Sequence, residues 1–499
     1  MSEPSPSDRE LDGYRAGADR FLAEMDEEYY LHYAGLKPDL DLRSIYERHA
    51  GLLELETVKR IGQAVLGREN LELFRFGCDG YLGELTREHD ERIAELETTL
   101  EVPHEGSTVG YRMLQPTIAN TAERQTRARL ESARNRLTEE HLNPLYLESV
   151  AAVQRAVPEL GAPTYFELYR DRFGYDLEGL AGQCRAFLDS TERLYEESMD
   201  RALRQQVGLG LADAERHDLR RFFRGTSWDS GFPADRMLPA LRSTLGDLGI
   251  DLDAQANVHL DVEERPTKSP RAFCAPIEVP EKVMLVIQPM GGPDDWRALF
   301  HEAGHTEHFA FTAADLLMEE KRLGDNAVTE GWAMLFDHLI DDRAWLNRML
   351  DFPKPNEFAA EGAVQTLFFV RRYSAKLLYE IEFHAAADAT SLRSRYVELL
   401  EDAVKVEPSD TDYLADIDTG YYVTSYLRAW SFAAQMTTFL REEFGTDWFR
   451  RREAGSLLRE LWSLGQKPTA DELLRDVTGS PIELEAVAEQ LRAALPTAA

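Results

Sequence analysis

Residues 282–308 read KVMLVIQPMGGPDDWRALFHEAGHTEH and contain the sharpest change of pattern in the chain. Lys282 to Ile287 is a short apolar run rich in branched side chains, which predicts a strand. Gly291-Gly292-Pro293 is a turn signal, and from Asp294 onward apolar residues recur at helical spacing. The stretch therefore predicts a strand, a turn and a helix with one buried flank.

Two short segments before this stretch also have strand patterns. Residues 258–262 alternate between apolar and polar side chains, and residues 271–276 form a second apolar run that ends before Pro280. Most of the remaining chain has helical patterns, for example over 122–141 and 177–204. We therefore predict a mostly α fold with a small β-sheet next to the helix described above.

The sequence has no internal repeat and no low-complexity linker that would divide the chain into separate domains. Residues 1–18 are polar and predict a disordered tail. Residues 19–499 predict a single domain, in which 19–255 form a helical N-terminal half and 256–499 form the half with the sheet and the motif helix.

The composition is that of an acidic globular protein, with 43% hydrophobic and 29% charged residues and a net charge of −34 over 499 residues. Nucleic acid and anionic membranes are poor partners for such a chain, because both attract basic surfaces. Cys78, Cys184 and Cys274 are too few and too far apart for a disulfide framework or a cysteine zinc site. The N-terminus lacks a secretory signal pattern, and no apolar run reaches the about 18 residues of a membrane span. We expect a cytoplasmic protein.

Residues 301–305, His-Glu-Ala-Gly-His, form an H-E-x-x-H motif on the predicted helix. Residues four apart share one helix face, so the imidazoles of His301 and His305 can reach one zinc ion. Glu302 lies one step round the helix, where its carboxylate suits a general base that activates water. The motif predicts one zinc ion per chain.

A catalytic zinc ion of this type needs a third protein ligand, and no third histidine follows at the spacing of an extended H-E-x-x-H-x-x-G-x-x-H motif. Glu307 is too close on the same helix, and Glu319 and Glu320 leave little chain for a return helix. Glu330 opens a second apolar helical segment after a loop. We favour Glu330 as the third ligand, with Asp325 as the second choice.

Three further polar residues lie close to these ligands in the sequence. His308 follows His301 by seven residues and shares nearly the same face, and we expect it to pack or to contact substrate rather than to bind the metal. Asp337 and His338 lie on the predicted Glu330 helix, where they suit hydrogen bonding to the ligands.

Phe300 to His308, F-H-E-A-G-H-T-E-H, resembles the F-H-E-x-G-H-x-x-H signature of the thimet oligopeptidase and oligoendopeptidase F family of zinc metallopeptidases. The resemblance implies a glutamate ligand at about the position of Glu330. It also implies a large helical ellipsoid with a deep central channel that admits only short, unfolded peptides. The related angiotensin-converting enzymes share H-E-x-G-H but lack the histidine matched by His308. Ala303 departs from the larger apolar residue that is common there.

A second stretch, Gly420 to Leu427 with the sequence GYYVTSYL, resembles the tyrosine-rich G-Y-x-x-Y-Y-S-Y-L segment of the same family, at a shorter spacing. In that family the tyrosines hydrogen-bond the substrate carbonyl and its oxyanion. The resemblance therefore implies Tyr426 and Tyr422 as catalytic residues and Tyr421 as a substrate contact. The alternative is that these tyrosines are half-buried core residues.

Together these patterns predict a zinc-dependent metallopeptidase that hydrolyses short oligopeptides. Glu302 is expected to take a proton from the activated water, and Tyr426 to stabilise the oxyanion. The strand that contains Phe273 and Ala275 is placed to pair with an extended peptide. Two alternatives stay open: a dipeptidyl carboxypeptidase or specialised amide hydrolase of the same fold, and a non-enzymatic binding protein. The patterns do not indicate the cleaved sequence or the oligomeric state.

Overall fold

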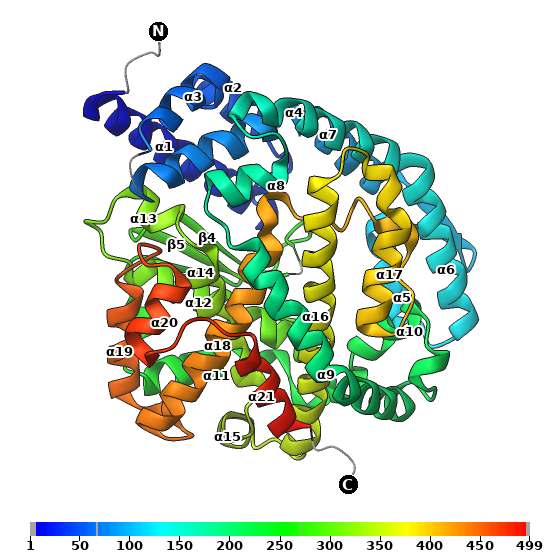
Figure 1. Cartoon of the computed structure of the whole chain (residues 1–499). Helices are drawn as coiled ribbons and strands as arrows, with labels where there is room; N and C mark the ends of the chain where they lie inside the picture. Colours follow the sequence, from blue (N-terminus) through cyan, green and yellow to red (C-terminus); the bar gives the residue numbers. More distant parts are fainter. Residues whose placement is uncertain (1–5, 66–67, 270, 496–499) are drawn as a thin grey trace. The chain divides into compact units, whose positions relative to one another are not determined.

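The computed structural model describes residues 6–65, 68–269 and 271–495, and nearly all regular elements in these residues are helices (Figure 1). Its described sheets are a two-stranded hairpin and a three-stranded sheet. The prediction of a mostly α fold with a small sheet next to the motif helix is therefore confirmed. Among the same residues, no helix has both the length and the apolar character that crossing a bilayer requires.

The chain forms two compact units, and each is assembled from three separate segments. Over the described residues, the first unit comprises Met1–Cys78, Thr226–Ala360 and Arg428–Val487, and the second comprises Asp79–Gly225, Glu361–Leu427 and Ala488–Ala499. The predicted single domain with halves 19–255 and 256–499 stays a prediction, and each of the two units draws residues from both halves.

The first unit holds the larger sheet and the motif helix. Its elements are α1 (Asp8–Tyr33), α2 (Leu42–Leu53), α3 (Leu55–Gln63), α11 (Met237–Asp247), β3 (Val258–Asp261), β4 (Phe273–Glu278), β5 (Lys282–Val286), α12 (Pro293–Phe311), α13 (Met318–Arg322), α14 (Asn326–Asp337), α15 (Arg343–Trp345), α19 (Arg452–Trp462) and α20 (Ala470–Thr478).

The second unit consists of helices and the hairpin. Its elements are β1 (Glu101–His104), β2 (Ser107–Gly110), α5 (Tyr111–Asn120), α6 (Arg124–Leu137), α7 (Asn143–Ala156), α8 (Tyr165–Glu167), α9 (Leu177–Gln206), α10 (Arg216–Phe223) and α17 (Arg393–Val404). Four helices contain a boundary between the units: α4 (Arg68–Thr99), α16 (Pro355–Ala385), α18 (Tyr422–Phe444) and α21 (Glu485–Ala494).

Helix α1 begins at Asp8, which corrects the prediction of a disordered tail over residues 1–18 from that residue onward. Ser7 and Glu10 form a capping box, in which the Glu10 carboxylate accepts the Ser7 backbone N–H at 2.8 Å. Leu11 and Tyr14 are buried, so the polar segment carries enough apolar side chains to pack as a helix. Residues 1–5 of the predicted tail lie outside the described residues.

The hairpin β1–β2 was not expected from the sequence. Its two strands pair in antiparallel fashion from Glu101↔Gly110 to His104↔Ser107. The connecting residues Glu105 and Gly106 both have positive φ, 49° and 83°. A two-residue turn of this kind matches the twist of the strands, but Glu-Gly is a weaker sequence signal than Asn-Gly or Asp-Gly.

The three-stranded sheet has the order β3–β5–β4, with β3 parallel and β4 antiparallel to β5. Its side chains alternate between two cores, as the strand period of two requires. Val283 and Leu285 of β5 join the large core that contains α12, whereas Met284 and Val286 join a smaller core with Ala34 at the end of α1. The sheet is therefore apolar on both faces, with α1 on one side and α12 on the other.

The large core surrounds α12. It contains five fully buried tryptophans on several elements of the first unit: Trp296, Trp332, Trp345, Trp448 and Trp462. Large aromatic side chains contribute much of the apolar area that stabilises a core. The motif helix is thus packed within the large buried core of its unit.

Candidate metal centre

The position of α12 is set by the turn that follows β5. Gly292 has φ 89°, and Pro293 occupies the first turn of the helix, where its missing N–H has no cost. The Asp295 carboxylate accepts the backbone N–H groups of Met290 and Gly291, at 2.7 and 2.9 Å. These bonds fix the direction in which α12 leaves the sheet.

Helices α12 and α14 cross at Gly304 with almost no space between their backbones. A Cβ atom at Gly304 would lie 2.6 Å from the Cα of Ala333 and 2.7 Å from the carbonyl oxygen of Trp332. Carbon atoms in contact are normally about 3.5–4.0 Å apart, so glycine is needed for this approach. The crossing brings the first turns of α14 opposite the histidine face of α12.

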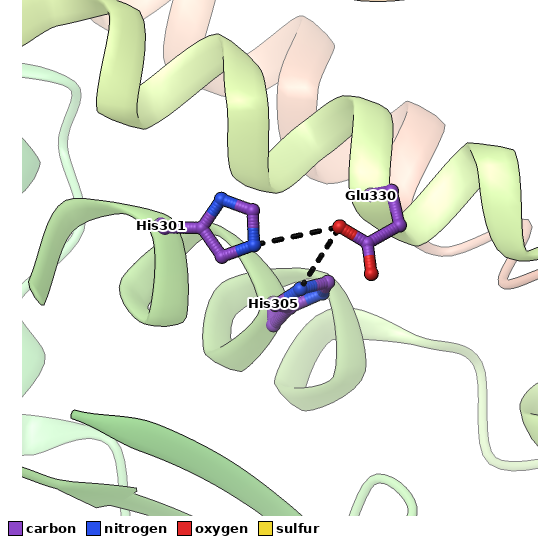
Figure 2. A group of neighbouring side chains, drawn as sticks. All are labelled: His301, His305 and Glu330. Atoms are coloured by element: carbon purple, nitrogen blue, oxygen red, sulfur yellow. Dashed lines mark ion pairs between the residues drawn. The ribbon is translucent and has the colours of Figure 1, made fainter. Parts of the chain in front are cut away.

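Figure 2 shows the side chains of His301, His305 and Glu330 turned toward one another. Glu330 Oε2 lies 3.4 Å from His301 Nε2 and 3.8 Å from His305 Nε2, and one ligand atom from each residue lies within 4.8 Å of the others. Ligands bound at about 2.1 Å to one tetrahedral zinc ion are about 3.4 Å apart, so the group fits such an ion. Within the described ranges, no other group of three histidine, cysteine or acidic side chains meets this criterion.

Each imidazole is held through its second nitrogen. His301 Nδ1 donates to the Asp337 carboxylate at 2.8 Å, and His305 Nδ1 is 2.8 Å from the Thr329 hydroxyl. These bonds leave Nε2 of both rings pointing at Glu330 (Figure 2). A partner on Nδ1 fixes the tautomer and the ring orientation that metal binding requires.

Charge and burial act in opposite directions on the two histidines. Burial opposes the charged form of His301, but hydrogen bonds to Asp337 and Glu330 raise its pKa to about 11. Burial lowers the pKa of His305 to about 4. A cation bound at Nε2 would therefore have to displace a proton from His301 but not from His305.

Glu302 lies beside the three-residue group and contacts the sheet. Its carboxylate accepts the backbone N–H of Cys274 in β4, with an N–O distance of 2.9 Å. Burial raises the pKa of Glu302 to about 7. A carboxyl group with such a pKa can both take up and release a proton near neutral pH, which a general base requires.

Asp325, the second choice for the third ligand, has a different role. It is the N-cap of α14, and its carboxylate accepts the backbone N–H of Ala327 at 3.1 Å. Both of its oxygens also accept from the Arg428 guanidinium, at 2.8 and 2.6 Å. The structure therefore brings Glu330, rather than Asp325, to the two histidines.

Strand β4 lies at the edge of the sheet. The backbone N–H and C=O groups of Ala275 point toward β5 rather than toward the outer edge of the strand. Residues in an antiparallel pair point their N–H and C=O groups alternately toward and away from the partner strand. Because Cys274 N–H points to Glu302, the neighbouring Ala275 points toward β5, where it pairs with Met284. The Ala275 side chain is also buried. The Ala275 side chain is therefore not accessible to a substrate, and pairing of a peptide with this strand stays a prediction.

His308 is completely buried in the core of the first unit. Its ring stacks on Phe309 with the centroids 5.3 Å apart. This position agrees with the expected packing role and corrects the prediction of a substrate contact, because no surface of the ring is accessible.

The predicted tyrosines belong to the second unit: Tyr421 directly precedes α18, and Tyr422 and Tyr426 lie in its first two turns. Tyr421 is completely buried among Tyr165, Tyr169 and His384, so it cannot contact a substrate in this conformation. It is a core residue, as the alternative interpretation stated. The rings of Tyr422 and Tyr426 lie 5.1 Å apart, and their catalytic role stays a prediction.

Two residues of the centre could not be identified from the sequence. Thr329 has no motif of its own, although its position directly before Glu330 is a weak signal. Cys274 acts through its backbone N–H, to which no side-chain pattern points. Asp337 was expected to support a ligand, and its carboxylate is hydrogen-bonded to His301 Nδ1 at 2.8 Å. His338 was expected to have the same role, and its Nε2 lies 3.7 Å from the Asp337 carboxylate.

No protein-family model matches this chain, and no curated protein matches it.

Proposed function

We propose that the protein is a zinc-dependent metallopeptidase that hydrolyses short oligopeptides. The observation that carries the proposal is the convergence of His301 Nε2, His305 Nε2 and a Glu330 oxygen within 4.8 Å, with Glu302 beside them. Two histidines and one glutamate are the ligand set of many hydrolytic zinc sites, in which a fourth position stays open.

Zinc bound by such a set supplies Lewis acidity and lowers the pKa of water. Glu302 would take the proton of the attacking water on its carboxylate and return it to the amide nitrogen, as the new C–O bond forms and the C–N bond breaks. The hydrogen bond from Cys274 N–H orients the Glu302 carboxylate in the resting site. Asp337 and Thr329 would hold the two imidazoles in register throughout.

The choice of oligopeptides comes from the resemblance of two motifs to the thimet oligopeptidase and oligoendopeptidase F family. On that basis we assign Tyr426, and with it Tyr422, as hydrogen-bond donors to the substrate oxyanion. We also propose a cytoplasmic setting. The three cysteines are free thiols, which suits a reducing compartment.

The proposal is tested by zinc analysis and hydrolysis of a peptide mixture. We expect about one zinc ion per chain in the wild type and in Glu302→Gln, and little in His305→Ala. Glu302→Gln should lower the rate about 100-fold to 10,000-fold, because it removes the general base. Glu281→Gln, which changes an exposed glutamate in the turn after β4, is the matched control and should leave the rate unchanged.

Mass spectrometry of the product ladder distinguishes the alternatives. Internal cleavage of several peptides supports an oligopeptidase, whereas products shortened only by carboxy-terminal dipeptides indicate a dipeptidyl carboxypeptidase. Zinc binding without hydrolysis of any peptide would refute the enzymatic proposal and favour a binding protein.

A further inference from the structure

Strand β4 connects the metal centre to a group of aromatic rings. Cys274 N–H contacts the Glu302 carboxylate, and the preceding residue, Phe273, carries a half-buried ring on the α1 face of the sheet. The ring of Tyr33, at the end of α1, lies 6.3 Å from the Phe273 ring in an edge-to-face arrangement. The Tyr29 ring stacks on the Tyr33 ring, and the two ring centroids are 6.1 Å apart. We call Tyr29, Tyr33 and Phe273 the aromatic ledge.

The aromatic ledge is open to solvent. Tyr33 is 44% exposed, and Tyr29 and Phe273 are partly exposed. Rings contribute to folding mainly through the area that they bury, so three neighbouring rings that stay partly exposed contribute less to stability than buried rings would. An exposed aromatic group that begins one residue before Cys274, whose backbone N–H contacts the buried Glu302 carboxylate, is instead suited to ligand contact.

We infer that the aromatic ledge receives an aromatic or large apolar side chain of the peptide substrate, next to the scissile bond. The inference rests on the proposed function and adds the substrate class. It follows from the pairing geometry of the outer edge of β4, where a bound peptide would replace the Glu302 carboxylate at the Cys274 N–H. A peptide residue opposite Phe273 would place its side chain on the same face of the sheet, with the Cβ atoms about 4.5–5.5 Å apart.

The neighbouring peptide residue, opposite Cys274, would point its side chain to the other face, where α12 carries His301 and His305. The reacting bond and the side chain on the aromatic ledge therefore belong to adjacent residues. This separation of one residue is short enough for the side chain to affect the rate directly.

The rings of the aromatic ledge favour an apolar occupant, because a lysine or arginine side chain would give up part of its hydration there. Arg271, which is exposed two residues before Phe273, also opposes a cationic side chain. The Arg265 guanidinium donates to the carbonyl oxygen of Ala34, directly after Tyr33, at 2.7 Å, but it is paired with Asp261 and Glu263 at 3.0 and 3.1 Å and adds no free charge.

The test uses quenched fluorescent peptides that carry Phe, Gly or Lys at each position flanking the bond that the zinc-loaded protein cleaves. At one flanking position we expect kcat/KM about tenfold higher for Phe than for Gly, and no such gain for Lys. Tyr33→Ala should reduce the Phe-to-Gly ratio to about twofold or less. Tyr33→Phe keeps the ring and should keep the ratio.

Phe369→Ala is the control, because Phe369 is an aromatic residue of similar exposure, 37%, in the second unit. It should not change the ratio. Thermal unfolding checks each variant, and Phe273→Leu gives the same readout should Tyr33→Ala fail to fold. An equal Phe-to-Gly ratio in the wild type and in Tyr33→Ala, or a preference for Lys, would refute the inferred role of the aromatic ledge. The proposed function would still stand in that case, because the peptides are hydrolysed. Hydrolysis of no peptide by the zinc-loaded wild type would overturn both.

Discussion

Gly304→Ala should damage folding and metal binding together, because Gly304 lies where α12 and α14 cross. The added Cβ would be 2.6 Å from Ala333 Cα and 2.7 Å from the Trp332 carbonyl oxygen. Both neighbours are backbone atoms, so no side-chain rotation can relieve the contact. The helices must separate by about 1 Å to restore an ordinary carbon contact of about 3.5 Å.

Two consequences of this separation can be estimated. Overpacking of a core typically costs about 1–3 kcal/mol, and a backbone contact should place Gly304→Ala at the upper end. His301 and His305 lie on α12 and Glu330 lies on α14, so the same shift also moves the ligands apart. A displacement of about 1 Å is large for a metal site, and we expect zinc affinity to fall about tenfold or more.

The assay is urea unfolding with a chelator present, followed by zinc titration against a chromophoric competitor. Gly13→Ala is the matched control: Gly13 is an exposed residue inside α1 with no atom within 4 Å of its Cβ position, so alanine should stabilise by about 0.5–1 kcal/mol. A Gly304→Ala variant with a free energy of unfolding within about 0.5 kcal/mol of the wild type and a zinc affinity within twofold of it would refute this expectation.

Three further outcomes follow from particular contacts. Asp337→Asn removes the carboxylate that holds His301 and should weaken zinc binding about tenfold to 100-fold in the competition titration, whereas a change below twofold would contradict this role. Asp218→Asn leaves the buried Arg127 without its carboxylate partner and should cost about 3–5 kcal/mol in urea unfolding at pH 7. Burial opposes the Asp218 charge, but its hydrogen-bonded partners, Arg127 among them, hold its pKa below 3.8. This stabilisation is present above pH 3.8 and is lost as the pH falls further. The difference in free energy of unfolding between the wild type and Asp218→Asn should therefore become smaller in acid, and a difference that stays constant would refute the role given to the Asp218 charge. Zinc at about 100 times its Kd should stabilise the wild type by about 2.7 kcal/mol over the chelated protein, and in His305→Ala the difference should vanish in a thermal scan.

Local patterns predicted the elements around the centre well. The strand Lys282–Val286, the Gly-Gly-Pro turn and helix α12 lie where the sequence placed them. Each depends on interactions between residues close in the chain: the period of apolar residues, the positive φ of Gly292 and the proline at the helix start. The two histidines share a face for the same reason, since helix geometry alone determines it.

Burial was the property that local patterns predicted least well. Ala275, His308 and Tyr421 each belong to a motif or strand that suggested substrate contact, yet all three are buried. Whether a side chain on a helix or strand faces a core or a ligand depends on the element that packs against it. That element is distant in the sequence, and for Tyr421 it includes Tyr165 and His384.

Local sequence patterns were enough to predict the helical class of the fold, the strand before the motif helix, and the position of His301, Glu302 and His305 on one helix. They left two choices for the third ligand, Glu330 and Asp325. The packing of α14 on α12 distinguishes these two residues, because the close crossing at Gly304 brings Glu330 to the histidines, while Arg428 holds Asp325 at the start of α14. The backbone N–H of Cys274 and the hydroxyl of Thr329 likewise become parts of the centre only when separate segments pack together, since neither group has a sequence pattern of its own.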